Sequence, residues 1–302
     1  MAVLAGRSLI SCPEAYSESL KSFSASLEPK HTTIKCLEEH VVPLISDVFQ
    51  DQSPFCILSV GSGRGHKDLS FIEMLSKAVG GKTNKLQFLE RALEPDETRL
   101  ESFRAKAKDL PESLKSRANI EFELLPVTYQ EYVEQKKKDD VKFDVVHFIQ
   151  SIYYVSNVET ALKHCYEKEL GPKGVIFSIT EDGKSAYTRY GRAFSSEGLI
   201  LNPGAYYSNV EVTDAAKKNG WKYEEFADES TNCDITAIFD HSSVKGNLLL
   251  DFLTHRVNVR QTTSQENLQR ILDFWENECI VDDRGRKMVK FPWKTVMILK
   301  GV

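Results

Sequence analysis

The chain has 302 residues, of which 41% are hydrophobic and 27% are charged, and its formal net charge is −5. This length and composition are typical of a globular protein with a sizeable core, and the negative charge argues against binding nucleic acid through bulk charge. No apolar stretch approaches the ~18 residues that a membrane-spanning helix needs.

The spacing of the cysteines and histidines indicates whether disulfides or a metal site should be expected. The six cysteines form no C-x-x-C pair and the seven histidines form no H-x-x-x-H pair, so we expect reduced thiols and no metal. Residues 2–10 are too few, and are interrupted by Arg7, for a signal peptide. We therefore expect a cytoplasmic protein, monomeric because no apolar interface helix stands out, without nucleic-acid or membrane partners.

In chain order, residues 1–50 show a helical pattern, and short apolar runs then alternate with helical patterns from residue 55 to about residue 185. The runs predict strands at 56–60, 86–93, 120–125, 143–149 and 174–180, with helices through residue 78 and over 97–107. Such alternation predicts parallel β-α-β units in an open sheet. Residues 185–285 are irregular and predict mixed strands and helices, and 294–299 predicts a late strand that rejoins the sheet.

A glycine-rich turn follows the first predicted strand. Gly61, Gly63 and Gly65 alternate with Ser62 and Arg64, and a helical pattern begins directly afterwards. Glycines let a ligand approach the backbone, and N–H groups at the start of a helix favour polar or anionic ligand groups. The turn therefore predicts a nucleotide-type cofactor site.

Two cofactor classes compete for this turn. A dinucleotide fingerprint requires a glycine at position 66, which is His66, and neither Tyr153 nor Tyr154 has a lysine four residues later, as short-chain reductases require. The pattern G-x-G-x-G instead resembles doubly wound methyltransferases that use S-adenosylmethionine. Glu94 ends the second strand, where its carboxylate can accept hydrogen bonds from a ribose diol. Many enzymes of that class carry an acid two residues before the first glycine, whereas this chain has Ser59.

The segment after the fourth strand is the candidate reaction site. Gln150, Tyr153 and Tyr154 follow this strand, at the sheet edge where open α/β folds bind ligands. Methyl transfer needs an acceptor held about 3–3.5 Å from the methyl group. A glutamine amide can orient a nitrogen without protonating it, and tyrosine faces attract cations. Ordinary packing is the alternative interpretation of both tyrosines.

Together these residues resemble the histamine N-methyltransferase family. The resemblance rests on residues 57–61, Glu94-Pro95, the segment Ile-Gln-x-x-Tyr-Tyr-Val at 149–155, residues 190–194 and the segment Leu-Leu-Asp-Phe-Leu-Thr at 249–254. It implies a doubly wound, Rossmann-like α/β methyltransferase sheet with a smaller substrate-binding subdomain, S-adenosylmethionine as cofactor, and N-methylation of a small amine or imidazole.

The resemblance also implies roles for individual residues. Cofactor-binding residues would be Gly61, Gly63, Gly65, Glu94, Arg99, Thr128, Tyr129 and Ile149. Gln150, Tyr153 and Tyr154 would be catalytic. Substrate-binding positions would be Tyr16, Glu28, Lys30, Gln150, Tyr187, Phe194, Phe252 and Trp293. Domain boundaries follow: an N-terminal helical segment covering the substrate site at 1–50, the cofactor domain at 51–184, the substrate subdomain at 185–285, and a C-terminal strand within 286–302.

Arg99 and Tyr187 stand where the family has a glutamine and a tryptophan, and two further departures bear on the identity of the acceptor. Lys30 stands where the family places the glutamate that binds the amine, although a different gap puts Glu28 there, and Trp293 stands where the family has an asparagine. A cation in the site repels an ammonium group, which favours a carboxylate-bearing imidazole such as carnosine as an alternative acceptor. A non-catalytic S-adenosylmethionine-binding protein is the alternative from another class.

Overall fold

The computed structural model describes residues 6–28, 32–49, 54–79, 85–135, 141–197, 199–227 and 230–302. These residues form two compact units. The first comprises the described parts of Met1–Lys30, Glu181–Tyr207 and Glu229–Trp293, and the second those of His31–Thr180, Ser208–Asp228 and Lys294–Val302. None of the described helices is both long and apolar enough to cross a membrane.

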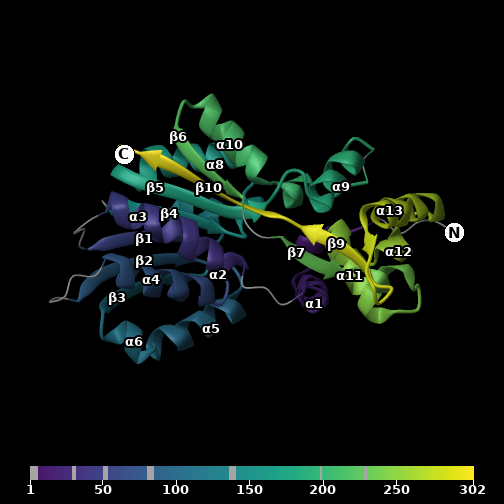
Figure 1. Cartoon of the computed structure of the whole chain (residues 1–302), viewed down its shortest axis with the longest axis horizontal. Helices are drawn as coiled ribbons and strands as arrows, with labels where there is room; N and C mark the ends of the chain where they lie inside the picture. The colour runs from purple at the N-terminus through teal and green to yellow at the C-terminus, as the bar shows by residue number, and fades with distance from the viewer. Residues whose placement is uncertain are drawn as a thin grey trace. The chain divides into compact units, whose positions relative to one another are not determined.

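The second unit contains a seven-stranded sheet with the order β3-β2-β1-β4-β5-β10-β6 (Figure 1). Its strands are β1 Phe55–Val60, β2 Leu86–Leu93, β3 Ala118–Leu125, β4 Phe143–Ile149, β5 Leu170–Glu181, β6 Lys222–Ala227 and β10 Trp293–Lys300. Strands β1 to β5 pair with one another in parallel, and β10 is antiparallel to β6. The expected doubly wound sheet, including the late strand that rejoins it, is confirmed.

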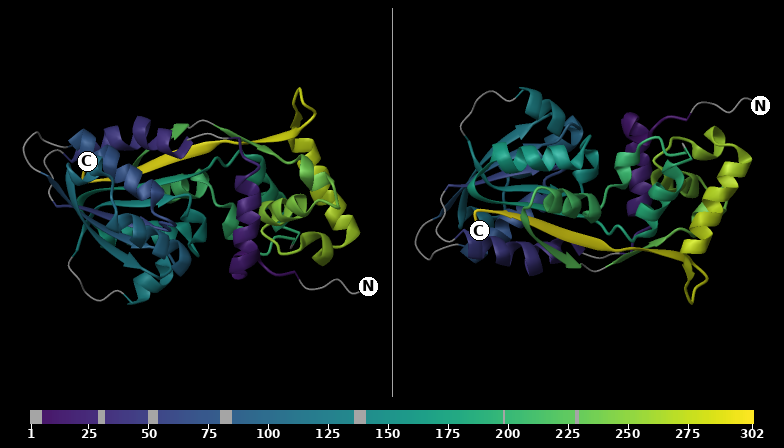
Figure 2. Two further views of the ribbon diagram at one scale, coloured as in Figure 1. Left: turned by 90° about the horizontal axis from the view of Figure 1, so that it is seen from below. Right: turned by 90° about the horizontal axis from the view of Figure 1, so that it is seen from above.

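Helices cover both faces of this sheet (Figure 2). They are α2 Thr32–Cys36, the π-helical η2 Leu37–Val41, α3 Val42–Val48, α4 His66–Val79, α5 Glu97–Lys108, α6 Glu112–Lys115, α7 Tyr129–Gln135, the 3₁₀ turn η3 Ile152–Tyr154, α8 Val158–His164, the π-helical η4 Cys165–Glu169 and α10 Asn209–Lys218. Helix α3 packs against α4, and α8 against α10. The central strands β1, β4 and β5 are almost continuously buried, as parallel strands covered on both sides must be.

The first unit is mainly helical, with a three-stranded sheet of order β7-β9-β8. Its elements are η1 Leu9–Ser11, α1 Pro13–Ser24, α9 Ala186–Ser195, η5 Pro203–Tyr206, β7 Thr231–Asp234, η6 Thr236–Phe239, α11 Val244–Thr254, α12 Val259–Thr262, α13 Gln265–Glu278, β8 Ile280–Val281 and β9 Lys287–Phe291. Its core centres on fully buried aromatic and aliphatic side chains such as Tyr190, Leu253 and Trp275.

The observed division differs from the boundaries expected from the sequence. Helix α3 belongs with the sheet unit because it packs on α4, and β6 belongs there because it pairs with β10. The segment 208–228 therefore adds a helix and an edge strand to the sheet, although it lies within the span 185–285 assigned to the substrate subdomain. This segment belongs to the sheet because β6 pairs with β10, a strand far later in the chain. The local sequence pattern does not indicate that pairing.

Candidate functional site

The glycine turn joins β1 to α4 at the point where the strand order reverses. Strand β1 lies between β2 and β4, and open α/β sheets bind ligands outside the carboxyl ends of their strands at such a switch point. Gly61, Gly63 and Gly65 all have positive φ angles, of 74°, 59° and 72°. A Cβ at Gly61 would lie 2.6 Å from the Ser151 Cβ, whereas a Cβ at Gly63 would meet nothing within 4 Å. The turn thus packs tightly at Gly61 and leaves backbone open to a ligand at Gly63.

Glu94 contacts this turn directly. Its side chain is 5% exposed, and its two oxygens accept hydrogen bonds from the backbone N–H groups of Gly63 at 2.8 Å and Asp96 at 3.0 Å. Burial raises the pKa of Glu94, and these two N–H donors together with Arg99 oppose the rise. A carboxylate offers about four lone-pair positions, so each oxygen keeps capacity for a hydroxyl donor of a bound ribose.

The turn after Glu94 is built by its own sequence. Asp96 accepts the backbone N–H of Arg99 at 3.1 Å and so caps the first turn of α5. The Arg99 guanidinium lies 3.3 Å from the Asp96 carboxylate. Arg99 is therefore held near the sheet edge by an ion pair, and its assignment to the cofactor stays a prediction.

The other expected cofactor residues lie at the ends of β3 and β4. Thr128 follows β3 and donates to the Glu131 carboxylate from both its N–H and its hydroxyl, at 2.7 and 2.8 Å. Tyr129 is buried, and its hydroxyl donates to the Ala161 carbonyl at 3.1 Å. Ile149 ends β4 and is 6% exposed. Tyr129 thus packs α7 on α8, Thr128 and Ile149 lie near the ends of β3 and β4, and the assignment of all three to the cofactor stays a prediction.

Gln150 has a backbone conformation that is uncommon for a residue with a side chain. Its φ is +54°, and its N–H donates to the Ile179 carbonyl at 2.9 Å, which ties it to β5. The Lys67 ammonium donates to Gln150 Oε1, and Gln150 Nε2 donates to Thr33 Oγ1 at 3.4 Å. The amide orientation is thus set from both ends.

Sequence reasoning missed Lys67. This lysine lies in the first turn of α4, two residues after Gly65, and is half-buried. Burial lowers the pKa of Lys67 to about 8, with Asp68 opposing the fall, so the ammonium is mostly protonated at neutral pH. A lysine this close to the last glycine could have indicated a functional residue. Its contact with Gln150, 83 positions later, could not be predicted from the sequence.

Tyr153 and Tyr154 lie in η3, the 3₁₀ turn after Gln150. Their ring centroids are 4.7 Å apart at an interplanar angle of 65°, an edge-to-face contact. Tyr154 is 37% exposed. Both rings therefore lie on the same short turn that follows the carboxyl end of β4.

The expected aromatic substrate residues lie in the first unit, where a buried histidine joins several of them. Phe252 lies 6.3 Å from Tyr16 and 5.7 Å from His255, measured between ring centroids, and the Tyr187 hydroxyl hydrogen-bonds to His255 Nε2. Burial lowers the pKa of His255 to about 4, so the imidazole is neutral at neutral pH. Phe194 packs instead on Tyr190, 4.8 Å away. Tyr16, Tyr187 and Phe252 are thus brought together around His255, which sequence reasoning missed.

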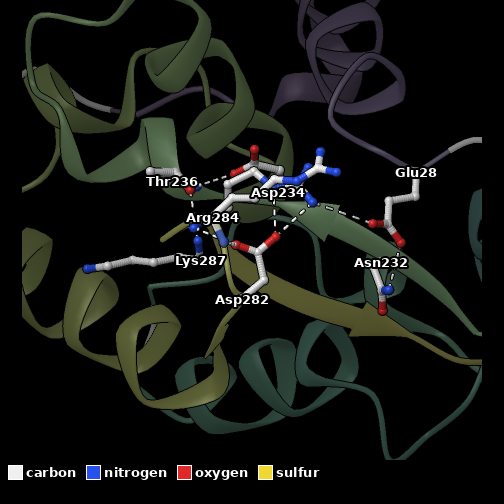
Figure 3. A network of polar contacts seen from close by, with 8 residues as sticks. Glu28, Asn232, Asp234, Thr236, Asp282, Arg284 and Lys287 are labelled. Atoms are coloured by element: carbon white, nitrogen blue, oxygen red, sulfur yellow. Dashed lines mark hydrogen bonds and ion pairs between the residues drawn. The ribbon is translucent and has the colours of Figure 1, made fainter.

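Glu28 is already engaged by other side chains. It accepts a hydrogen bond from Asn232 Nδ2 at 2.7 Å and lies 3.7 Å from the Arg286 guanidinium, and Figure 3 shows Glu28 and Asn232 turned toward each other. Arg286 also pairs with Asp282 at 2.8 Å. A ligand ammonium would have to compete with this guanidinium for Glu28. Trp293 begins β10 and is half-buried, and Lys30 lies outside the described residues.

A buried cluster of titratable groups lies beneath the glycine turn. Atoms of Asp68, Glu90 and His147 lie within 4.8 Å of one another, and all three side chains are buried. The Ser59 hydroxyl donates to Asp68 Oδ1, and His147 stacks on Phe177 with 5.1 Å between ring centroids. Burial, and next the neighbouring Asp68 charge, hold the pKa of Glu90 well above its ordinary value. Carboxylates and imidazole also bind divalent cations, so the absence of a metal stays a prediction.

Replacing Glu90 with glutamine tests the protonation of this cluster. The unfolded chain loses the Glu90 proton as the pH rises past 4.5, whereas the folded chain retains it, so the wild type loses stability above that pH. A glutamine side chain cannot titrate and still offers a donor to Asp68. We expect Glu90→Gln to raise the free energy of unfolding by about 1–3 kcal/mol at pH 8 and to have little effect at pH 4.

Urea unfolding of wild type and variant at the two pH values measures this difference. Glu121→Gln, at an exposed position of the neighbouring strand β3, is the matched control and should show no gain that depends on pH. Equal effects of Glu90→Gln at pH 4 and pH 8 would show that Glu90 is ionised in the folded protein.

The fold and the turn define the class to which the protein belongs. A putative methyltransferase from Bacillus halodurans C-125 shares the fold with a TM-score of 0.51 at 12% identity, covering 86% of this chain and 99% of that one. No family model matches the chain. The chain is an α/β protein with the doubly wound, Rossmann-like methyltransferase fold.

The sequence comparisons are more specific. The chain is 25% identical over 283 residues to histamine N-methyltransferase of Bos taurus, covering 93% of this chain and 94% of that protein. It is 26% identical over 272 residues to histamine N-methyltransferase A of Xenopus laevis, covering 88% of each chain. The similarity to histamine N-methyltransferases that the sequence motifs indicated is therefore confirmed over nearly the whole chain.

Proposed function

We propose that the protein is an S-adenosylmethionine-dependent N-methyltransferase that acts on a small amine or imidazole of the histamine type. This proposal rests on the position of Gln150 next to the glycine turn at the switch point of the sheet. Gln150 follows β4 and the turn follows β1, which pairs with β4. Lys67, directly after the turn, donates a hydrogen bond to Gln150. The similarity to histamine N-methyltransferases over 93% of the chain supports the reaction class.

The cofactor site proposed here consists of the turn and Glu94. S-adenosylmethionine, when bound, supplies a methyl group activated by its sulfonium. The open backbone at Gly63 accommodates close approach of the ligand, and Glu94 accepts the ribose hydroxyls. The two glutamate–backbone bonds fix the carboxylate before the ligand arrives, which reduces the ordering cost of binding.

The proposed role of this chain in the reaction is orientation. Gln150, held between Lys67 and Thr33, aligns the acceptor so that its neutral nitrogen lone pair points at the methyl carbon. The nitrogen–carbon bond would form as the sulfur–carbon bond breaks and a neutral thioether leaves. The cationic product would then lose a proton, from the methylated nitrogen of an amine or from the other ring nitrogen of an imidazole. Tyr153 and Tyr154 offer ring faces that stabilise positive charge and exclude water. Alignment of this kind supplies much of the acceleration in reactions between two bound partners.

A panel of acceptors tests the proposal. Purified protein is incubated with methyl-labelled S-adenosylmethionine and with histamine, carnosine or simple arylalkylamines, while calorimetry measures cofactor binding separately. We expect label transfer to at least one imidazole or amine, with kcat/KM at least about 10-fold above that of the poorest acceptor. Tight cofactor binding without transfer to any member would instead indicate a non-catalytic binding protein.

The carboxylate-bearing acceptor is the second candidate within this function. Lys67 favours it, because the ammonium lies beside Gln150 and would repel a protonated amine. A kcat/KM clearly higher for histamine than for carnosine would refute this candidate and leave the histamine-like activity.

A further inference from the structure

Lys67 is a cation without an acidic hydrogen-bond partner in the part of the chain that the structure describes. Its hydrogen bond goes to the neutral Gln150 Oε1, and the carboxylate nearest in sequence, Asp68, is buried and bound by the Ser59 hydroxyl. Asp68 acts on Lys67 through its charge, but among the described residues no carboxylate accepts a hydrogen bond from the ammonium, although buried or half-buried cations are normally paired in this way. The ammonium is therefore set to receive an anionic group of a ligand.

The hydrogen bond from Lys67 also determines whether Gln150 offers a donor or an acceptor to a ligand. Because Lys67 occupies Oε1, the amide nitrogen faces away from the lysine and makes one long hydrogen bond, 3.4 Å, to Thr33 Oγ1. The two side chains together thus offer N–H donors, from an ammonium and from an amide. Such a pair matches the acceptor oxygens of a carboxylate and mismatches the donors of an ammonium group.

Lys67 is also close to the expected point of reaction. It lies in the first turn of α4, directly after the glycine turn, and contacts the residue that directly follows β4. A ligand group bound there is held at the switch point of the sheet. This position makes Lys67 a determinant of which acceptors are aligned.

Resting on the proposed function, we propose that Lys67 binds a carboxylate of the methyl acceptor, so that the protein selects imidazole acceptors with an anionic side chain over those with an ammonium side chain. The ammonium of Lys67 forms the ion pair, and the Gln150 amide nitrogen donates to the same carboxylate.

Three acceptors with one ring test the selection. They are 3-(imidazol-4-yl)propionate, 4-methylimidazole and histamine, which differ in the charge of the side chain. We expect the wild type to methylate the propionate with kcat/KM at least about 10-fold above that of histamine, and Lys67→Met to reduce this ratio at least about 10-fold. Lys67→Arg should restore most of the preference. Because each ratio is measured within one protein preparation, partial loss of folded protein does not affect it.

A second experiment tests whether Lys67 binds the carboxylate of the methyl acceptor or the carboxylate of S-adenosylmethionine. Lys67→Met should bind S-adenosylmethionine and its decarboxylated analogue with an affinity ratio equal to that of the wild type. Selective weakening of S-adenosylmethionine would assign Lys67 to the cofactor carboxylate and overturn the proposal. If methyl transfer occurs and the propionate-to-histamine ratio is the same in wild type and Lys67→Met, this inference fails and the proposed function stands. Absence of transfer to all three acceptors by a wild type that binds the cofactor would refute this inference, and the wider acceptor panel would then test the proposed function separately.

Discussion

We expect replacement of Gln150 by alanine to lower kcat/KM about 100-fold or more while cofactor affinity changes less than about 3-fold. The amide is held by Lys67 and by Thr33, and the backbone by Ile179. Without the amide the acceptor is free to turn in the site, so the rate of methyl transfer, which needs alignment, falls. Steady-state kinetics with the preferred acceptor and calorimetry with S-adenosylmethionine measure the two effects.

Two further variants control for the chemistry of this change. Gln87→Ala deletes the same side chain at an exposed position near the start of β2, far along the strand from the carboxyl edge, and should leave kcat/KM unchanged. Gln150→Asn keeps an amide and suits a positive φ, but its shorter side chain loses the contacts, so activity should remain low. A wild-type rate in Gln150→Ala would remove Gln150 from the mechanism.

The second large effect is expected for Gly61→Ala. Its φ of +74° costs a side chain roughly 1–2 kcal/mol, and the new Cβ would lie 2.6 Å from the Ser151 Cβ, which forces β1 and the segment after β4 apart. We expect the free energy of unfolding to fall by about 2–4 kcal/mol. Cofactor affinity should fall about 10-fold or more, because the turn that presents Gly63 has shifted.

Gly220→Ala separates backbone strain from crowding. Gly220 has a similar φ of +67°, but a Cβ there meets nothing within 4 Å. This variant should lose about 1 kcal/mol of stability and keep full cofactor affinity. Equal cofactor affinity in Gly61→Ala and Gly220→Ala, measured by calorimetry, would contradict the place of the cofactor at this turn.

Local patterns were sufficient to predict six of the seven strands of the sheet, and β6 was the one that they did not predict. Strands β2 and β4 begin and end at the residues expected from the sequence. In the helix expected over 97–107, Leu100 and Phe103 are both fully buried. Glu94, expected to end the second strand, directly follows β2, and Pro95 interrupts the strand there.

The contacts that control the site were not predictable in this way. Lys67 with Gln150, and Glu28 with Arg286, join residues that are far apart in the sequence, and neither pair has a local pattern. His255 falls at the end of α11 with a positive φ of 48°, where it caps the helix and meets Tyr187. Contacts between side chains of different helices and strands depend on how these elements pack. The spacing of residues in the sequence predicts only the helices and strands themselves.

The most direct test of the account is to identify the atom that is methylated. Incubation with S-adenosylmethionine carrying a ¹³C-labelled methyl group, followed by NMR of the product, should show the label on a nitrogen of an imidazole or small amine, and Gln150→Ala should form far less of that product. A labelled methyl on oxygen, sulfur or carbon, or a wild type that binds the cofactor yet methylates none of the acceptors, would contradict it.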